Sequence, residues 1–461
     1  MWRLFQKVDV HSLVFLRIVF GILAFADVLS SWIYKHFYLQ VFDPDSFRFT
    51  YYGFQWVQPF PEPFMSLFFI LTLLASIGIA IGWRYRWCCT WYAVAFTYLF
   101  LLDKSFYLNH GYLFCWLSFL MIFLPAQHAF SADVLAGRVS RWSKIPFWPL
   151  FILRFTMGLV YFYGGLAKIN ADWLNGMPLK LWLKAKSDMP LLGPLWEQEW
   201  VAYFMSYGGL GLDLFVTFFL LSSRTRIWAL LFTIFFHSVN LIIFKIGIFP
   251  FLSVAMTLMF FAPNFPLIIL DWLQKRLPFI ARPRQAWQRT VAAIPPSDPP
   301  APSEGRQRWI VGLIGLYALI HMTLPFRQYY FPGPTAWTEE GHRYAWRMML
   351  RSKSGYGNFT VKNLQTGETF RENPKDYLPR KAKRKMYTHP DMILQFAHLL
   401  RDQYHEKGMT EVAVYADIRV RLNGRRAQQY VDETVDLAKV EWSFFEPSEW
   451  ILPFREEEEH K

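Results

Sequence analysis

Apolar residues fill long runs of the chain up to about residue 326, and a more even mixture of polar and apolar residues follows. A helix that crosses the hydrocarbon core of a bilayer needs about 20 mostly apolar residues. The runs that reach roughly this length are 12–32, 65–83, 147–169, 203–222, 227–247 and 250–272. Shorter or more polar runs cover 88–102, 110–126 and 308–326. The pattern predicts a polytopic α-helical membrane protein with about nine transmembrane helices.

The C-terminal part of the chain has the patterns of a smaller α+β domain. Residues 411–422 alternate between apolar and polar positions, as in a strand with one buried face. The pair Asn423-Gly424 follows, which is typical of a β-hairpin turn, and the chain is expected to return through 428–431. Residues 390–406 have the apolar spacing of an amphipathic helix. We therefore expect an α+β fold that contains a β-hairpin.

The Lys and Arg residues beside the apolar runs predict how the chain is oriented, because cytoplasmic loops carry an excess of them. With a cytoplasmic N-terminus, the basic residues on that side are Arg84, Arg86, Arg138, Arg141, Lys144, Arg224 and Arg226, followed by the basic stretch 275–308. A Pro-rich linker, 292–305, lies within this last stretch. We expect a transmembrane domain over 1–326 and an extracytoplasmic domain, on the periplasmic or lumenal side, over 327–461.

Composition supports the membrane assignment and argues against other classes of protein. The chain is 54% hydrophobic and 18% charged, whereas a soluble globular chain has roughly 25% charged residues. A net charge of +13 would suggest a nucleic-acid partner for a soluble protein. Here the basic residues lie in short loops, so we expect a lipid bilayer and no nucleic acid as partner. The 3 cysteines lie in or beside apolar runs, which predicts neither a disulfide framework nor a metal site.

Polar side chains within the apolar runs are the first candidate functional residues, because such groups are costly in lipid and usually line a cavity or pair with one another. They are Arg17, Asp27, His110, Arg154, Lys168, Asp213, His237 and Asn240. Lys168 has two interpretations: it extends from a helix end to the interface, or it is buried, where loss of water favours the neutral amine and lets it act as a base. For His110, and for the pair His237 and Asn240 on one helix face, the alternative is a structural role in hydrogen bonding between helices.

Several segments of the chain follow one another in a recognisable order. They are VDVHSLVFLRIVFG, FLLDKSFYLNHGYL, VYFYGGLAKINADWLNG, GGLGLDL, FFHSVNLIIFKIGIFPF and AWRMMLRSKS, followed by HPDMILQFAHLL and VYADIRVRLNGRRAQQ. Together they resemble the vitamin K-dependent gamma-glutamyl carboxylase family, whose wider group shares a horizontally transferred transmembrane (HTTM) domain. The similarity is collinear over nearly the whole chain.

The resemblance implies a membrane enzyme, a carbon–carbon lyase that couples carboxylation to quinone epoxidation. Members of the family deprotonate vitamin K hydroquinone and react it with O₂, and the strong base that results removes a γ-proton from a peptide glutamate. The carbanion takes up CO₂, and the quinone leaves as the epoxide. The implied cofactor is reduced vitamin K, a membrane quinone; O₂ and CO₂ are co-substrates, the substrate is a glutamate-containing polypeptide, and no metal is implied. Since no protein side chain can remove so weakly acidic a C–H proton, the cofactor must supply the driving force while the protein binds, orients and excludes water.

The resemblance also implies the roles of individual residues. The family's starting base, the lysine before its ADW motif, matches Lys168, and the assisting histidine of its Asn-His segment matches His110. The family's quinone pocket matches Asn109, Tyr107, Phe249, Met348, Met349 and Arg351. The remaining candidates for the pocket or its support are His237, Asn240, Asp172 and Trp173.

The sequence departs from the animal enzymes at two points. Ala167-Lys168 stands where they carry two adjacent lysines, and they continue beyond the end of this chain and use an inter-domain cysteine bridge. We therefore expect a short member of the family without that C-terminal extension. Two alternatives to carboxylation stay open: a hydroquinone epoxidase or other quinone oxidoreductase, and a non-enzymatic membrane carrier on the same scaffold.

Overall fold

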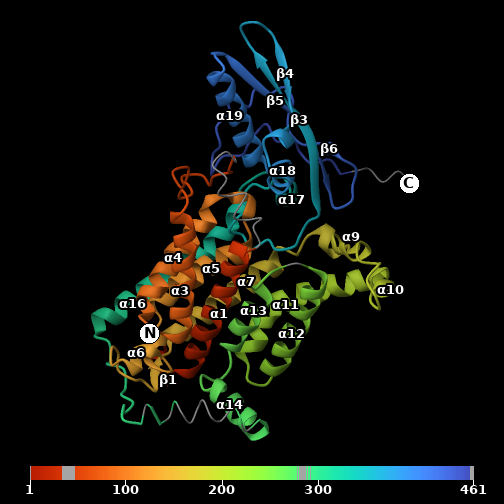
Figure 1. The fold of residues 1–461 in the computed structure, drawn as a ribbon. Coiled ribbons are helices and arrows are strands. Elements are labelled where there is room, and N and C mark those ends of the chain that lie inside the picture. Colours follow the sequence, from red (N-terminus) through yellow and green to blue (C-terminus); the bar gives the residue numbers. More distant parts are fainter. Residues whose placement is uncertain are drawn as a thin grey trace.

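The computed structural model describes residues 2–33, 47–244, 246–277 and 292–456, together with residues 279, 287, 289 and 290. Its larger part is a bundle of helices, and a smaller domain that contains a sheet lies at one end of this bundle (Figure 1). The bundle helices are α1 (His11–Ile33), α3 (Phe64–Ile81), α4 (Tyr85–Leu102), α5 (Asn109–Phe123), α7 (Trp148–Leu166), α11 (Glu199–Leu221), α12 (Arg226–Ile243), α13 (Phe249–Leu258) and α16 (Glu304–Thr323).

Six helices of the described chain are long and apolar enough to cross a membrane. They are α1, α3, α7, α11, α12 and the segment Glu304–Tyr329, which contains α16. Two further apolar helices, α5 and α13, are shorter, with 15 and 10 residues. The predicted fold class, a polytopic helical membrane protein with a smaller α+β domain, is confirmed, whereas the count of nine spans is not.

The predicted span 250–272 is not one helix, because the structure divides it into α13 and α14 (Phe265–Arg276). Pro263 lies in the turn between them, and proline has no N–H to donate and disfavours a helical conformation in the residue before it. The break frees backbone carbonyls, and Arg154 of α7 donates from its Nε to the carbonyl oxygen of Met259 at 2.8 Å. In Figure 1, α14 lies apart from the packed helices.

Three segments with predicted cytoplasmic positions meet at one end of the bundle. The strands β1 (Lys7–Asp9) and β2 (Lys144–Pro146) pair antiparallel. From the Pro-rich linker, Asp298 forms an ion pair with Lys7 at 2.7 Å, and the next residue toward the N-terminus, Ser297, donates its N–H to the carbonyl oxygen of Arg141 at 2.8 Å. Short helices at this end are η1 (Trp2–Phe5), η3 (Ala126–His128) and α6 (Ala132–Leu135). The three segments can make these contacts only if they lie on the same side of the membrane.

The opposite end of the bundle carries short helices and the α+β domain (Figure 1). The short helices are η2 (Lys104–Phe106), α8 (Ala171–Leu174), α9 (Leu179–Lys184) and α10 (Gly193–Trp196). The chain enters the domain from α16 through η5 (Leu324–Tyr329). The elements of the domain are α17 (Thr335–Thr338), β3 (Lys353–Asn363), β4 (Thr369–Glu372), η6 (Pro374–Asp376), α18 (Arg380–Met386), α19 (Pro390–Glu406), β5 (Val412–Leu422) and β6 (Gln428–Gln429).

A four-stranded antiparallel sheet in the order β4-β3-β5-β6 packs against α19. Alternate residues of β5 are buried, as its apolar alternation predicts. Asn423 and Gly424 both have positive φ (48° and 83°), which is the conformation that a type I′ turn requires. The N–H of Arg425 closes this turn by donating to the carbonyl oxygen of Leu422 at 3.1 Å. The ladder resumes only at β6, so the connection is longer than a two-residue hairpin.

Polar contacts join the α+β domain to the bundle. Arg425, beside the hairpin turn, forms an ion pair with Asp172 of α8, and the Asn423 amide donates to the same carboxylate at 2.6 Å. Burial would raise the pKa of Asp172, but the hydrogen bonds from Arg425 and Asn423 lower it below its ordinary value. Lys104 of η2 forms a second link, an ion pair with Asp391 of α19 at 2.6 Å. The end of the bundle and the domain therefore share a polar interface.

The positions of these segments generate a test of topology. We expect reporter fusions after residue 300 and after residue 400 to report opposite sides of the membrane, because α16 is apolar and long enough to cross it between the two points. Alkaline phosphatase and green fluorescent protein report the two sides independently. The same side for both fusions would contradict the assignment of Glu304–Tyr329 as a span.

Candidate active site

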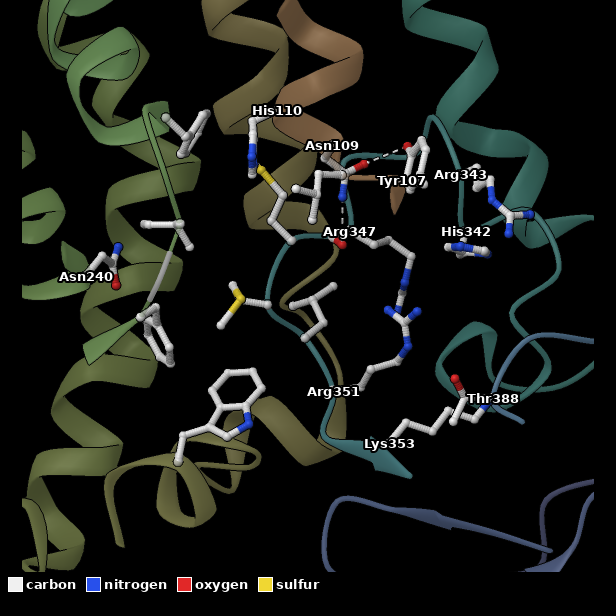
Figure 2. A pocket seen from close by; sticks show the side chains of 18 of the residues that line it. Tyr107, Asn109, His110, Asn240, His342, Arg343, Arg347, Arg351, Lys353 and Thr388 are labelled. Atoms are coloured by element: carbon white, nitrogen blue, oxygen red, sulfur yellow. Dashed lines mark hydrogen bonds between the residues drawn. The ribbon is translucent and has the colours of Figure 1, made fainter. Parts of the chain in front are cut away.

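A cavity of about 1300 Å³ lies between the end of the bundle and the α+β domain. Its walls come from α5, α7, α11, α12 and α13 on the bundle side, and from the loop 342–351, the start of β3 and α18 on the domain side. In Figure 2, Asn240 lies on one side of the space, and His342, Lys353 and Thr388 lie on the other. Both domains are therefore needed to enclose this cavity.

Lys168 and Asp213 form a buried ion pair in the wall of the cavity. Lys168 follows α7, and its Nζ lies 2.5 Å from Oδ2 of Asp213 on α11; the two side chains are 6% and 7% exposed. Two glycines make this approach possible. A Cβ on Gly165 would lie 2.8 Å from the backbone nitrogen of Leu214, and one on Gly164 would lie 3.1 Å from Oδ2 of Asp213. The Gly-Gly pair lets α7 and α11 pack closely enough to bring the amine onto the carboxylate.

The surroundings of Lys168 are those of a buried amine, not of a lysine that extends to the interface. Its Nζ donates a second hydrogen bond to the carbonyl oxygen of Gly164 at 3.2 Å and lies 5.3 Å from the centre of the Trp173 ring. Partners at this depth hold the amine in one position and keep bulk water from it.

Aromatic and imidazole rings form the apolar end of the cavity. The ring centroids of His110 and His237 each lie 5.7 Å from that of Phe249. Nε2 of His237 lies 3.4 Å from the hydroxyl of Tyr161. Its Nδ1 is buried and has no hydrogen-bond partner within the described ranges, and a buried polar atom of this kind is costly unless it is satisfied. A ligand with an apolar ring and a hydroxyl or carbonyl oxygen, as in a quinone, fits this end.

Tyr107 and Asn109 connect the bundle to the loop that crosses the cavity. The hydroxyl of Tyr107 donates to Oδ1 of Asn109 at 3.0 Å and accepts the N–H of Tyr344 at 2.7 Å. The side-chain amide of Asn109 donates to the carbonyl oxygen of Arg347 at 3.0 Å, which Figure 2 shows. The two residues thus bind loop backbone, and their role in the site is to position the loop.

The loop that contributes Arg347–Arg351 to the cavity wall is strained. Tyr344, Trp346 and Met349 have φ of 67°, 55° and 53°, a left-handed conformation that costs residues other than glycine about 1–3 kcal/mol each. Met348 and Met349 face the cavity. Such strain persists only where the surroundings hold it, and here the hydrogen bonds from Tyr107 and Asn109 do so.

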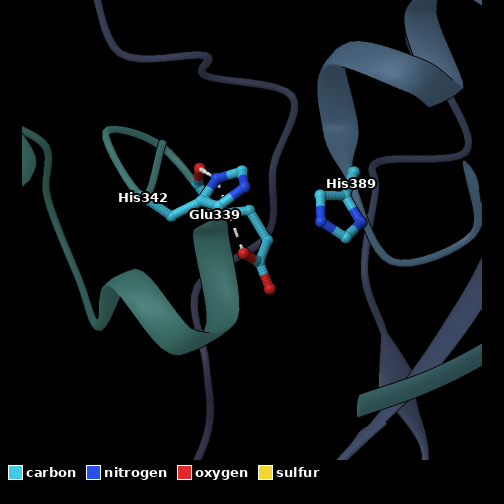
Figure 3. Close-up of side chains that lie close together, drawn as sticks. All are labelled: Glu339, His342 and His389. Atoms are coloured by element: carbon cyan, nitrogen blue, oxygen red, sulfur yellow. Dashed lines mark hydrogen bonds and ion pairs between the residues drawn. The ribbon is translucent and has the colours of Figure 1, made fainter. Parts of the chain in front are cut away.

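Glu339, His342 and His389 lie close together on the domain side (Figure 3), and this group has the donor types of a metal site. The carboxylate of Glu339 is already paired with Arg351 and with Lys353 (3.3 Å). Burial, together with neighbouring cations, holds the pKa of both histidines well below the ordinary value, so they are neutral. Because a divalent cation would meet net positive charge here, we assign no metal to this group and derive no step through one.

Cations dominate the rest of the domain side. Asp391 accepts from Arg343 at 2.8 Å and from Lys104 at 2.6 Å; burial would raise the pKa of this carboxyl, but the two cations lower it to about 2. Burial lowers the pKa of Lys353 to about 7. Arg347 donates to the neutral amide of Gln328 at 2.7 Å. The cavity therefore has an apolar end in the bundle and a cationic end in the domain.

The structure places nearly all predicted site residues in one cavity. Those that line it are Tyr107, Asn109, His110, Lys168, Trp173, His237, Asn240, Phe249, Met348, Met349 and Arg351. Asp172 does not line it, because its carboxylate is bound by Arg425 and Asn423 at the domain interface.

The residues that give this site its charge were not predicted from the sequence as members of the site. The sequence marks Asp213 only as a polar residue within a span. Polar residues within spans usually pair with one another, and this rule could have suggested Asp213 as the partner of Lys168. Arg347 and Lys353 both lie within the AWRMMLRSKS segment and could have been included with it. The basic run of α18 was visible in the sequence, but nothing there showed that it faces the cavity.

Comparison with known families agrees with this geometry. The family model described as the HTTM domain matches residues 5–265, more than half of the chain, and the model described as the vitamin K-dependent gamma-carboxylase lumenal domain matches residues 306–457. No solved structure matches the chain significantly. The two matches follow the two domains of the fold, and the name of the second agrees with an extracytoplasmic C-terminal domain. The chain therefore belongs to the vitamin K-dependent gamma-carboxylase family, with an HTTM domain followed by the family's lumenal domain.

Proposed function

We propose that this chain is an enzyme that carboxylates glutamate side chains of a polypeptide, with vitamin K hydroquinone, O₂ and CO₂ as co-substrates. One observation carries the proposal: a single cavity joins a buried Lys168–Asp213 pair and an apolar end to a cationic end. The apolar end suits a quinone that arrives from the bilayer, and the cationic end suits the carboxylate of a glutamate. When bound, the hydroquinone supplies through its oxidation by O₂ the driving force that removes the γ-proton of glutamate.

Lys168 is the residue that we assign as the starting base. In this proposal the Nζ of Lys168 enters the reaction as the neutral amine and accepts the first proton, and the carboxylate of Asp213, 2.5 Å away, stabilises the ammonium that results. The burial of the pair matters in two ways: an electrostatic contact is stronger where water is excluded, and no exchange with bulk water competes with the transfer. A guanidinium could not replace the amine, because it stays protonated.

His110 and His237 are assigned to orient the ring and oxygens of the bound quinone. Both rings lie against Phe249, so the three side chains form an aromatic surface. The unpartnered Nδ1 of His237 is the polar atom that a quinone oxygen would satisfy. By the family pattern, His110 assists the reaction with glutamate.

The domain side of the cavity binds and orients the glutamate in this proposal. Arg351 and Lys353 share one carboxylate, Glu339, and among the residues that the structure describes the guanidinium of Arg347 donates to a neutral amide, that of Gln328. Guanidinium groups bind carboxylates in a planar, two-point geometry. A glutamate held here points its γ-carbon toward the bundle, where Lys168 lies. This cationic end favours carboxylation over the alternative of hydroquinone epoxidation alone, which needs no carboxylate site.

The proposal is tested by incubating the purified protein with vitamin K hydroquinone, O₂, labelled bicarbonate and a glutamyl peptide. We expect epoxide and labelled peptide to form together, and omission of the peptide serves as the control for label. Epoxide without fixed label would support the epoxidase alternative. The absence of both products, in protein that is folded and binds the hydroquinone, would support a carrier.

Substitutions of Lys168 test its assignment as the base. We expect Lys168→Ala and Lys168→Arg to abolish both epoxide formation and carboxylation, because both depend on the first proton transfer and neither alanine nor a guanidinium can accept the proton. Product formation is measured with hydroquinone at saturation. A Lys168→Arg variant that turns over at the wild-type rate would show that only a positive charge is needed, and would remove the base from the mechanism.

A double substitution separates the role of Lys168 in chemistry from its role in the fold. Removal of one partner of a buried ion pair leaves an uncompensated charge and costs about 3–5 kcal/mol, so Lys168→Ala should lower the thermal unfolding temperature. Lys168→Ala combined with Asp213→Asn removes both charges, and we expect it to recover much of the stability while it stays inactive. Recovery of activity along with stability would assign Lys168 a structural role only.

A further inference from the structure

The charge of the cavity wall is not balanced by the acidic residues that the structure places beside it. Ten of the lining side chains are Lys or Arg, and one, Asp213, is an acid. Asp213, together with Glu339 and Asp391 behind the wall, pairs with five of these cations. The other five are Arg347 and four residues of α18, and none of these five has a carboxylate at ion-pairing distance in the part of the chain that the structure describes. The excess positive charge is therefore concentrated on α18.

The four cavity-facing cations of α18 form one stripe. Arg380 and Arg384 are one helical turn apart, and so are Lys381 and Lys385; all four line the cavity. The other face of the helix is held in place by Ala382 and Met386, which are buried in the core of the α+β domain, as Leu378 just before the helix also is. The orientation of the stripe is thus set by the packing of α18.

This stripe does not stabilise the helix that carries it. Like charges four residues apart on a helix repel one another. Cations in the first turn also lie at the positive end of the helix dipole, and the first turn of α18 has no acid. Burial and the nearby Arg351 lower the pKa of Lys385 to about 8, so this amine gives up its proton more readily than an exposed lysine. Because these basic residues face the cavity without stabilising their own helix, α18 is suited to bind an anion that is not part of the chain.

The location of the stripe indicates which kind of anion it binds. It lines the same cavity as Arg351 and Lys168, and three of its members, Arg380, Lys381 and Arg384, are exposed to solvent. A polypeptide whose target glutamate occupies the cationic end must leave through the solvent-exposed part of the cavity, and its neighbouring residues then lie over α18. A lipid headgroup is also an anion, but it is not covalently linked to the glutamate that occupies the cavity. The neighbouring residues of the substrate polypeptide are.

We propose that the cavity-facing side of α18 is a binding site for acidic side chains that flank the target glutamate. This inference rests on the proposed carboxylation. It assigns to α18 the selection of the segment to be modified, and to Lys168 and the loop 344–351 the chemistry and the orientation of the single glutamate.

Two peptides test the proposal. Each carries one glutamate, flanked by Asp residues in the first peptide and by Asn residues in the second, and each has a fluorescent label. Binding to the full-length protein in phosphatidylcholine nanodiscs is measured by fluorescence anisotropy, without hydroquinone. We expect the wild type to prefer the Asp-flanked peptide, and the preference to shrink as salt is added, because the contacts are partly exposed.

Matched variants locate the preference. Arg380→Gln combined with Arg384→Gln removes two exposed charges from the stripe, and should weaken binding of the Asp-flanked peptide by about two- to thirtyfold, as expected for two exposed ion pairs, while binding of the Asn-flanked peptide is unchanged. Lys375→Gln combined with Lys383→Gln removes two charges from the same region outside the cavity lining, and should keep the wild-type preference. Circular dichroism of each variant verifies the fold.

The outcomes separate this inference from the proposed function. Equal affinity of the wild type for both peptides, or an equal loss of preference in the control variant, would overturn the α18 site even if both peptides are carboxylated. A preference that is lost only in the α18 variant would support the site even if no label is fixed. If the α18 variant changes binding only to vesicles that contain phosphatidylglycerol, and not to the peptides, the stripe binds lipid and the proposal is wrong.

Discussion

The contact between Lys168 and Asp213 is the constraint on which the arrangement of the site depends. Two ionisable groups in an apolar surrounding stay together, because either alone would carry the full cost of a buried charge. Their contact requires α7 and α11 to approach within the space that Gly164 and Gly165 leave open. The same approach fixes the end of α7, and with it the position of the loop that runs through α8 to the domain interface. Helix packing and the proton chemistry proposed for Lys168 thus depend on the same residues.

The loop 344–349 connects this membrane site with the charged domain. It holds left-handed residues that are unfavourable by themselves, and its backbone is fixed by the side chains of Tyr107 and Asn109 from the bundle. Since the strain is resisted by contacts from the other domain, the loop has its shape only when the domains are together. The side chain of Met348 lies beside Gly164 of α7, while Arg347 and Arg351 lie at the cationic end of the cavity.

Much of the fold could be predicted from local patterns, and the failures have physical reasons. The long apolar runs, the alternation of β5 and the Asn423-Gly424 turn are local signals, and the structure follows them. The end of α13 also has a local signal, Pro263 and Pro266. The continuous apolar run across these prolines nevertheless favoured a single span. The pairing of Lys168 with Asp213 joins residues far apart in the chain, so it depends on how helices pack and no spacing rule reveals it. The cavity-facing stripe of α18 depends on how two domains dock. Lys168, His110 and His237 could be singled out as polar residues within apolar runs, whereas the quinone-pocket residues were expected from the resemblance to a known family over nearly the whole chain.

Because both domains contribute to the cavity walls, the cavity is assembled from residues that are synthesised at different times. The chain is made from its N-terminus, so the bundle residues Lys168, His110 and Asp213 are inserted long before the ribosome reaches the loop 344–349 and α18. With α16 as the last span, those later residues must cross the bilayer before they can cover the bundle. A half-made chain therefore has the paired amine but no closed chamber around it. In the proposed topology, the cavity is therefore completed only after translocation ends, and the chemistry proposed for it is confined to the far side of the membrane.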